Sequence, residues 1–151
     1  MMADLSDGLS IVDEMYALIK SGKADLVCGS RYMIGGRQYG GPKLKGFLSR
    51  TAGITLHLLS GIPTHDVTNS YKMYRKKMLR HINVESTGGF EIGMEIAVKA
   101  YLKGYKIAEF PAEWYDREGG ESHFHMWKWM PSYLRWYMLC IVKSIGRRRR
   151  V

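Results

Sequence analysis

Apolar residues recur at helical spacing in three stretches of the chain. The first has Ile11, Met15, Leu18 and Ile19 three or four positions apart, and the others cover residues 43–59 and 91–102. Ser21-Gly22 ends the first stretch, Gly61-Ile62-Pro63 ends the second, and Gly104 ends the third. We therefore predict three amphipathic helices, with Ser10 as the N-cap of the first and a short basic helix at 76–82.

Strand patterns lie between these helices. Residues 24–28 form a short apolar run, 70–74 alternate, and 106–114 form a third candidate whose Pro111 suggests an edge or a bulge. The glycine-rich stretch 31–42 is predicted to be a functional loop. Helices and strands alternate, which favours the α/β class, and three strands are few for a self-sufficient sheet.

Composition restricts the class of protein further. The chain has 151 residues, of which 46% are hydrophobic, which suits one folded domain and excludes a disordered chain. It has no apolar run of 18 residues, and its two cysteines are too few for a disulfide scaffold. The composition thus favours an ordinary folded domain from a reducing compartment.

Charge is distributed unevenly around a net value of +9. Residues 31–81 contain ten bases and one acid, Asp66. After Glu121 there are seven bases and no acid. These two basic stretches predict an anionic partner for at least one of them.

Three short stretches have residues suited to binding ions. Asp4, Ser6 and Asp7 offer oxygen ligands for a hard divalent cation, although by themselves the two aspartates are explained more simply by an acidic helix start. The other two stretches are suited to anions, through the residues Arg31, Lys45, Ser49, Arg50, Arg117 and Ser122. The simpler alternatives are a solvated basic helix face around 43–50 and a surface turn at 116–122.

Two further observations leave alternatives open. Basic residues beside Tyr32 and Tyr39 could bind nucleic acid, but no nucleic-acid motif accompanies them. His65 and Asp66 could act in acid–base chemistry, while a hydrogen-bonded turn before a strand explains them more simply.

Taken in order, these motifs resemble one family. The motifs are, in chain order, residues 1–7, Gly29-Ser30-Arg31-Tyr32, the helix bearing Lys45 and Ser49, residues 66–71, Glu95, Gly104-Tyr105 and residues 116–122. Together they resemble family 2 glycosyltransferases. The branch they resemble most is the dolichol- or polyprenyl-phosphate sugar transferases. The resemblance covers residues 1–122, and residues 123–151 form a separate aromatic and basic segment.

The resemblance implies a partial GT-A fold, with a mixed sheet, helices and the nucleotide-binding N-terminal half missing. It implies a nucleotide-sugar donor, a polyprenyl-phosphate acceptor and Mg²⁺ or Mn²⁺. Asp4 matches the second acid of the Asp-x-Asp metal motif, whose first position is Met2 here, and Ser6 and Asp7 complete the expected ligands. The implied catalytic residues are Asp4, Arg31 and Arg117, and the implied substrate-binding residues are Lys45, Ser49, Arg50, Glu95 and Ser122.

Because this chain starts almost at the metal motif, we expect a fragment that is inactive alone and associates through an exposed sheet edge. Trp127, Trp129, Tyr133, Trp136 and Tyr137 are typical of a membrane interface, although a helix that covers the sheet explains them equally well. The chain is expected in the cytoplasm, at the inner face of the membrane, without nucleic acid. The alternative function is a non-catalytic basic module that binds nucleic acid or an anionic membrane.

Overall fold

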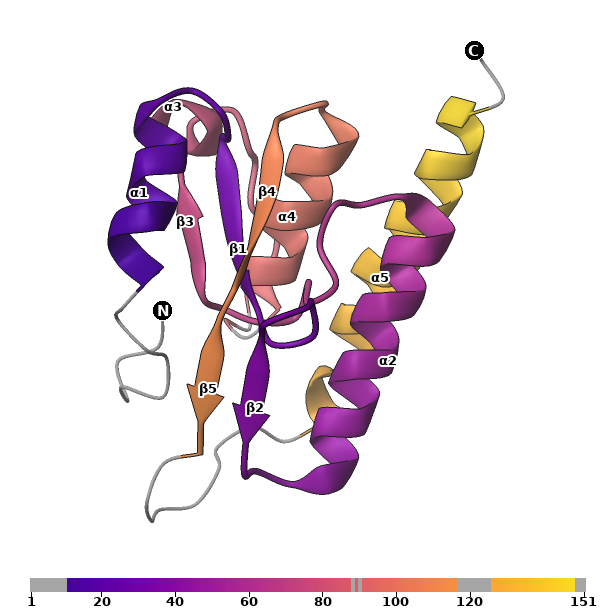
Figure 1. The fold of residues 1–151 in the computed structure, drawn as a ribbon. Helices are drawn as coiled ribbons and strands as arrows, with labels where there is room; N and C mark the ends of the chain where they lie inside the picture. Colours follow the sequence, from indigo (N-terminus) through magenta and orange to yellow (C-terminus); the bar gives the residue numbers. More distant parts are fainter. Residues whose placement is uncertain (1–10, 88, 90, 117–125, 149–151) are drawn as a thin grey trace.

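The computed structural model describes residues 11–87, 89, 91–116 and 126–148 (Figure 1). The helices are α1 (Val12–Lys20), α2 (Lys43–Ser60), α3 (Lys76–Leu79), α4 (Ile92–Leu102) and α5 (Met126–Arg148). The strands are β1 (Leu26–Ser30), β2 (Arg37–Tyr39), β3 (Lys72–Tyr74), β4 (Ile107–Pro111) and β5 (Glu113–Tyr115). The predicted helices are all present, and the predicted cap Ser10 lies outside the described residues.

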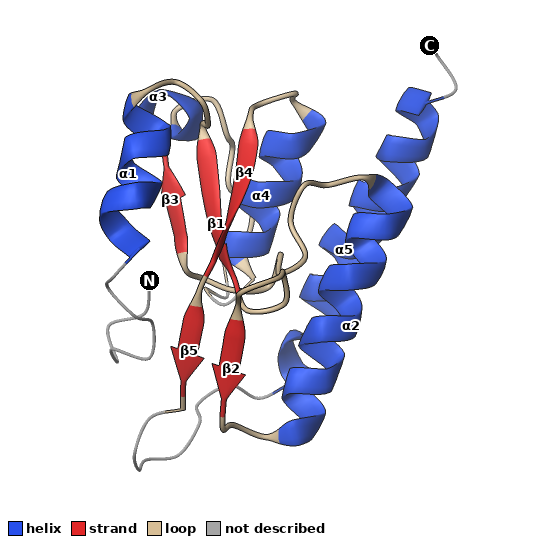
Figure 2. Cartoon of the chain, in the orientation of Figure 1, coloured by secondary structure: helices blue, strands red, loops and turns tan. Residues whose placement is uncertain are grey.

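The strands form two small sheets, shown in Figure 2. In the larger sheet β1 lies between β3, to which it is antiparallel, and β4, to which it is parallel. In the smaller sheet β2 and β5 pair in parallel. The architecture is therefore α/β with mixed strand directions, as predicted, and it is compatible with part of a GT-A fold.

The edge position that Pro111 suggested is confirmed, since β4 lies at the edge of the larger sheet. The prediction of a single strand over 106–114 is wrong, because the chain changes sheets within it. Pro111 ends β4, and the next residue, Ala112, joins the two sheets. The Ala112 N–H donates to the Ser30 carbonyl at 2.9 Å, and its own carbonyl accepts from the Arg37 N–H at 3.0 Å. The stretch 31–42, predicted as a loop, therefore contains β2, because Arg37–Tyr39 pair with β5.

Side chains of β1 alternate between two apolar layers. Leu26 and Cys28 point into the larger cluster with residues of α2, α4 and α5, whereas Val27 points to the cluster that includes Met15 of α1. All four side chains are fully buried. The end of β1, from which Arg31 emerges, is therefore held firmly between two layers.

The C-terminal helix α5 packs against α2 and α4. It is longer than predicted, so that Pro131, expected near the helix start, lies inside it. Trp136 is only 2% exposed and belongs to the larger core cluster, so its assignment to a membrane-facing aromatic group is wrong. No helix in the described part of the chain combines the length and apolarity needed to cross a membrane.

Candidate active site

Arg31 and Asp66 form the centre of the candidate site. Arg31 directly follows β1, and its Nε and Nη2 donate to the two carboxylate oxygens of Asp66 at 2.7 and 2.9 Å. The Arg31 backbone N–H donates to the same carboxylate at 3.1 Å. Asp66 is fully buried, while the Arg31 side chain is 12% exposed. The pair therefore fixes a guanidinium group at the edge of the protein surface.

Ser49 of α2 connects this pair to a helix. Its hydroxyl accepts from Arg31 Nη2 at 3.0 Å and lies 2.6 Å from the Thr68 hydroxyl. Three segments far apart in the sequence thus meet at one point: the end of β1, the middle of α2 and the turn before β3. The sequence placed Arg31 and Ser49 in one site, and the structure brings them into contact.

The turn that bears Asp66 is attached to β4 through Glu109. Glu109 Oε1 accepts from the His65 N–H at 2.5 Å and from the Thr64 hydroxyl at 3.0 Å. Its other oxygen, Oε2, lies 2.7 Å from His65 Nδ1. The turn predicted here is present, and its position relative to the sheet is set by a carboxylate from a distant strand.

The same turn approaches α2 very closely. A Cβ atom built on Gly53 would lie 2.0 Å from the His65 carbonyl oxygen, so only glycine allows this contact. On the other side, Asn69 Nδ2 donates to the Gly29 carbonyl at 3.0 Å. The position of Asp66 is therefore determined by β1, β4 and α2 together.

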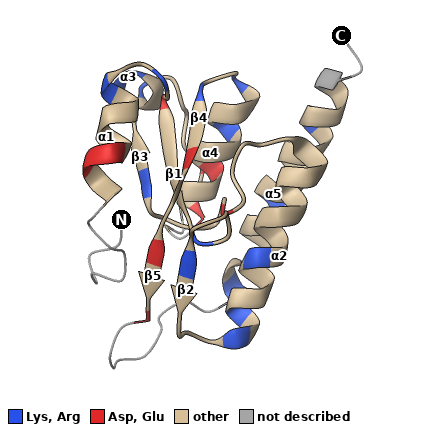
Figure 3. Cartoon of the chain, in the orientation of Figure 1, with Lys and Arg blue, Asp and Glu red and all other residues tan. Residues whose placement is uncertain are grey.

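Two other predicted binding residues lie on α2. Lys45 precedes Ser49 by about one helical turn, and Arg50 follows it directly. Both side chains are exposed. Figure 3 shows that the basic residues of α2 gather toward its N-terminal half, while acids lie on α1, α4 and β5. The site is thus bordered by cations.

Tyr32 closes one side of the guanidinium. The Arg31 guanidinium carbon lies 4.7 Å from the centre of the Tyr32 ring, and the Tyr32 hydroxyl donates to Gln38 Oε1 at 3.1 Å. Burial is the main cause that raises the pKa of Tyr32. The phenol is therefore neutral at physiological pH and contributes packing and a hydrogen bond.

Glu95 has a different set of contacts. Its fully buried carboxylate accepts from the backbone N–H groups of Glu85 and Ser86 at 2.6 and 2.8 Å and from Lys99 Nζ at 2.6 Å. Burial acts to raise the pKa of Glu95, but hydrogen bonds from Lys99, Ser86 and Glu85 outweigh it and lower the pKa. Because this carboxylate is buried and accepts three hydrogen bonds from the protein itself, its observed contacts are structural ones.

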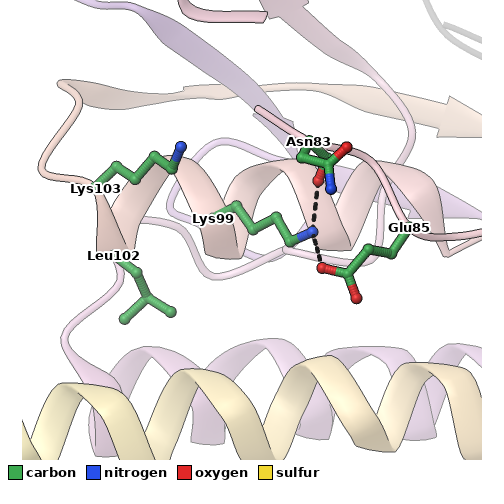
Figure 4. Close-up of a pocket in the computed structure, with 5 residues that line it drawn as sticks. All are labelled: Asn83, Glu85, Lys99, Leu102 and Lys103. Carbon is green, nitrogen blue, oxygen red and sulfur yellow. Dashed lines mark hydrogen bonds and ion pairs between the residues drawn. The ribbon is translucent and has the colours of Figure 1, made fainter. Parts of the chain in front are cut away.

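A shallow hollow of about 290 Å³ lies beside this group (Figure 4). It is lined by Asn83, Glu85, Lys99, Leu102 and Lys103, none of which is a predicted site residue. Lys99 Nζ already contacts the Asn83 carbonyl at 2.5 Å and Glu85 at 2.6 Å. We therefore assign these contacts to stability and place the candidate site at Arg31.

The remaining predicted residues lie outside the part of the chain that the structure describes. They are Asp4, Ser6, Asp7, Arg117 and Ser122. Within residues 11–87, 89, 91–116 and 126–148, no group of three acidic, histidine or cysteine side chains is placed to hold a metal ion. The predicted metal ligands therefore have no counterpart among the described residues.

Glu109 was missed as a functional candidate, Thr68 was named only as part of the motif 66–71, and Asp66 was considered for acid–base chemistry but not as the partner of Arg31. Asp66 had a usable signal, because it is the single acid among ten bases in residues 31–81. An isolated acid in such a stretch is a natural partner for one specific base. Thr68 and Glu109 gave no comparable signal, since their partners are set by the tertiary fold.

Comparison with known proteins found two informative similarities. The chain is 31% identical over 121 residues to polyprenol monophosphomannose synthase of Mycolicibacterium smegmatis, covering 78% of this chain and 46% of that protein. It is 31% identical over 122 residues to undecaprenyl-phosphate mannosyltransferase of Micrococcus luteus, covering 78% and 49%. The chain thus spans about half the length of the curated relatives it matches. No family model matches it.

Proposed function

We propose that this chain transfers a sugar from a nucleotide-sugar donor to a polyprenyl phosphate. The chain is related to polyprenyl-phosphate sugar transferases, which confirms the resemblance of its motifs. The observation that supports this most directly is the contact of Arg31 with Ser49. Cationic and hydroxyl donors at one point suit a phosphate group. The relatives do not favour the alternative of a non-catalytic basic module.

The proposed chemistry requires little from a general base. The phosphate oxygen of the acceptor is already an anion near neutral pH, so the protein has to hold it and reduce its repulsion from the donor diphosphate. Asp66 fixes the guanidinium of Arg31 before the lipid arrives, which lowers the entropic cost of binding. We assign Arg31, Ser49 and Lys45 to the acceptor phosphate, with Arg50 as a neighbouring cation.

The donor side of the proposal depends on residues outside the described ranges. Arg117 and Ser122 are proposed to contact the donor diphosphate. Asp4, Ser6 and Asp7 provide carboxylate and hydroxyl oxygens, a donor set that fits Mg²⁺ or Mn²⁺. When bound, such an ion would neutralise charge on the leaving diphosphate. Mannose is the first sugar to test, since both relatives are named for it.

The two proposed substrates differ in solubility, which supports a location at a membrane surface. A nucleotide sugar is a charged, water-soluble molecule, whereas a polyprenyl phosphate is held in lipid. We propose that the chain works peripherally at the inner face of the membrane. Association with a second copy through a sheet edge remains a separate proposal.

Substitution of Arg31 tests the acceptor assignment. Arg31→Lys keeps a positive charge beside Asp66 but loses the two-pronged geometry of a guanidinium. We expect farnesyl phosphate to bind this variant about tenfold or more weakly in isothermal titration calorimetry. Transfer of mannose from its nucleotide to undecaprenyl phosphate should fall in parallel. Arg37→Lys is the matched control, because Arg37 is exposed and its side chain contacts Tyr39.

The binding measurement tests the acceptor site, and the transfer measurement tests catalysis. Wild-type chain that does not bind farnesyl phosphate would contradict the acceptor site. Binding without any sugar transfer would contradict transfer by this chain and agree with the expectation that a chain spanning about half the length of its relatives is inactive alone. Circular dichroism melting of both variants shows whether a loss of binding comes from unfolding.

A further inference from the structure

Two histidines from different segments lie face to face near the candidate site. His57 is in the last turn of α2, and His65 lies in the turn between α2 and β3 (Figure 1). The centres of their rings are 4.1 Å apart, and the ring planes are inclined by 34°. Gly53, one helical turn before His57, is the glycine that lets the His65 backbone approach α2. The two imidazoles are therefore brought together by the packing of the turn against the helix.

Each ring uses the same nitrogen to contact the protein. His57 Nδ1 lies 2.7 Å from the Ile62 carbonyl oxygen, and His65 Nδ1 lies 2.7 Å from Glu109 Oε2. A carbonyl oxygen and a carboxylate oxygen accept hydrogen bonds and do not donate them, so each neutral ring carries its hydrogen on Nδ1. The Nε2 atom of each neutral ring therefore keeps a lone pair.

Both lone pairs are available to a ligand from solvent. Among residues 11–87, 89, 91–116 and 126–148, no hydrogen bond joins either Nε2 atom to another residue. The His65 side chain is 36% exposed, and His57 is partly exposed. The structure thus offers two neighbouring imidazole nitrogens whose tautomers are already set.

Paired imidazole nitrogens with this support are suited to a transition-metal ion. Imidazole is a preferred ligand of Zn²⁺, Cu²⁺ and Ni²⁺, whereas Mg²⁺ prefers oxygen ligands. A histidine that binds a metal usually donates its other N–H to a carboxylate or a backbone carbonyl, which fixes the orientation of the ring. Glu109 and Ile62 provide one acceptor of each kind.

We propose that the Nε2 atoms of His57 and His65 bind one zinc ion. Zinc–nitrogen bonds are about 2.0–2.1 Å long, so two nitrogens on one ion lie no more than about 4 Å apart. The 4.1 Å between the ring centres is close to this limit. Two protein ligands leave two tetrahedral positions for water. The site differs in its ligand chemistry from the oxygen ligands proposed at Asp4, Ser6 and Asp7.

The ion would join α2 directly to the turn that carries Asp66. His65 is next to Asp66, and His57 follows Ser49 by about two helical turns. Asp66 and Ser49 are the two side chains that hold the Arg31 guanidinium. Bound zinc would therefore restrain the two segments that position Arg31 and stabilise the folded chain.

Isothermal titration of the full chain with zinc chloride, in excess magnesium chloride, tests the site. We expect wild type to bind one zinc ion that magnesium does not displace. His57→Asn and His65→Asn each keep an N–H donor at the position of Nδ1 and remove Nε2. Each should weaken zinc binding about tenfold or more. His81→Asn is the matched control, because His81 lies outside the pair and its Nδ1 is 3.2 Å from the Tyr105 hydroxyl.

Two further measurements keep the proposal open to contradiction if a variant folds poorly. A hundredfold excess of zinc over its dissociation constant should raise the melting temperature of wild type by about 5 °C or more. X-ray absorption at the zinc edge of wild type, at one equivalent of zinc, should show two imidazole ligands. Fewer than two imidazoles, no zinc binding by wild type, displacement by magnesium, or equal binding by both Asn variants would overturn the proposal. None of these readouts depends on sugar transfer.

Discussion

The imidazole Nδ1 of His65 lies 2.7 Å from Glu109 Oε2, although the two residues are 44 positions apart. His65 precedes Asp66, the residue that orients Arg31. Glu109 also accepts the His65 N–H and the Thr64 hydroxyl, so one carboxylate from β4 holds three donors of the turn. The orientation of Arg31 therefore depends on a residue that does not itself touch Arg31.

Glu109→Ala is expected to loosen this turn. The variant leaves the Thr64 and His65 donors without their acceptor, and we expect the free energy of unfolding to fall by about 2–3 kcal/mol in urea titrations. Binding of farnesyl phosphate should weaken as well, because Asp66 loses its support. Glu113→Ala changes an exposed position on β5, and its free energy of unfolding should stay within about 0.5 kcal/mol of the wild-type value. Equal effects of the two substitutions would argue against the role of Glu109.

Two glycines give a sharp test of packing around the site. Gly53→Ala would bring a Cβ within 2.0 Å of the His65 carbonyl, so α2 and the turn would have to separate. We expect a loss of about 2 kcal/mol or more in the free energy of unfolding. Gly146→Ala in α5 has nothing within 4 Å and should instead stabilise the protein by up to about 1 kcal/mol through helix propensity. Thermal melting of the two variants should therefore shift in opposite directions.

Local pattern was sufficient for much of the fold. The apolar spacing over 43–59 predicted α2 almost to its ends, and Gly61 adopts the left-handed conformation expected at a helix end. The single strand at 106–114 was wrong because Pro111 indicates an edge or a bulge but does not indicate that the chain changes sheets at Ala112. That distinction depends on Ser30 and Arg37, the backbone partners of Ala112.

The candidate site was predictable only in part. Arg31 and Ser49 were grouped by motif, and they are in contact. Glu109 could not be assigned, since its importance comes from the crossing of β4 beside the turn and not from its neighbours in sequence. Trp136 shows the converse difficulty: its amphipathic ring suits a membrane interface, but the packing of α5 on α4 and α2 buries it.

Removal of divalent metal tests the donor side of the proposed reaction. After treatment with EDTA, we expect sugar transfer to stop and to return on addition of Mg²⁺ or Mn²⁺, because the leaving diphosphate needs a counter-charge. Asp4→Asn should raise the metal concentration needed for half-maximal rate. The unfolding curve should be the same with and without EDTA if the ion serves only the donor. Transfer at an unchanged rate in EDTA would contradict metal dependence.

Glu95 should make the stability of the protein depend on pH. Its pKa is lower in the folded chain than the usual value of about 4.3 for the unfolded one, so its carboxylate stabilises the fold above about pH 4 and ceases to do so as the pH falls through the lowered pKa. Glu95→Gln keeps the shape but loses the charge that receives Lys99 and two N–H donors. We expect it to lower the free energy of unfolding by about 2 kcal/mol near neutral pH, and by less at an acidic pH below the lowered pKa, where wild-type Glu95 has gained a proton. Urea titrations at both pH values measure this difference, with Glu113→Gln as the exposed control. A deficit of the same size at both pH values would show that the contacts of Glu95 stabilise the fold through shape alone and not through its charge.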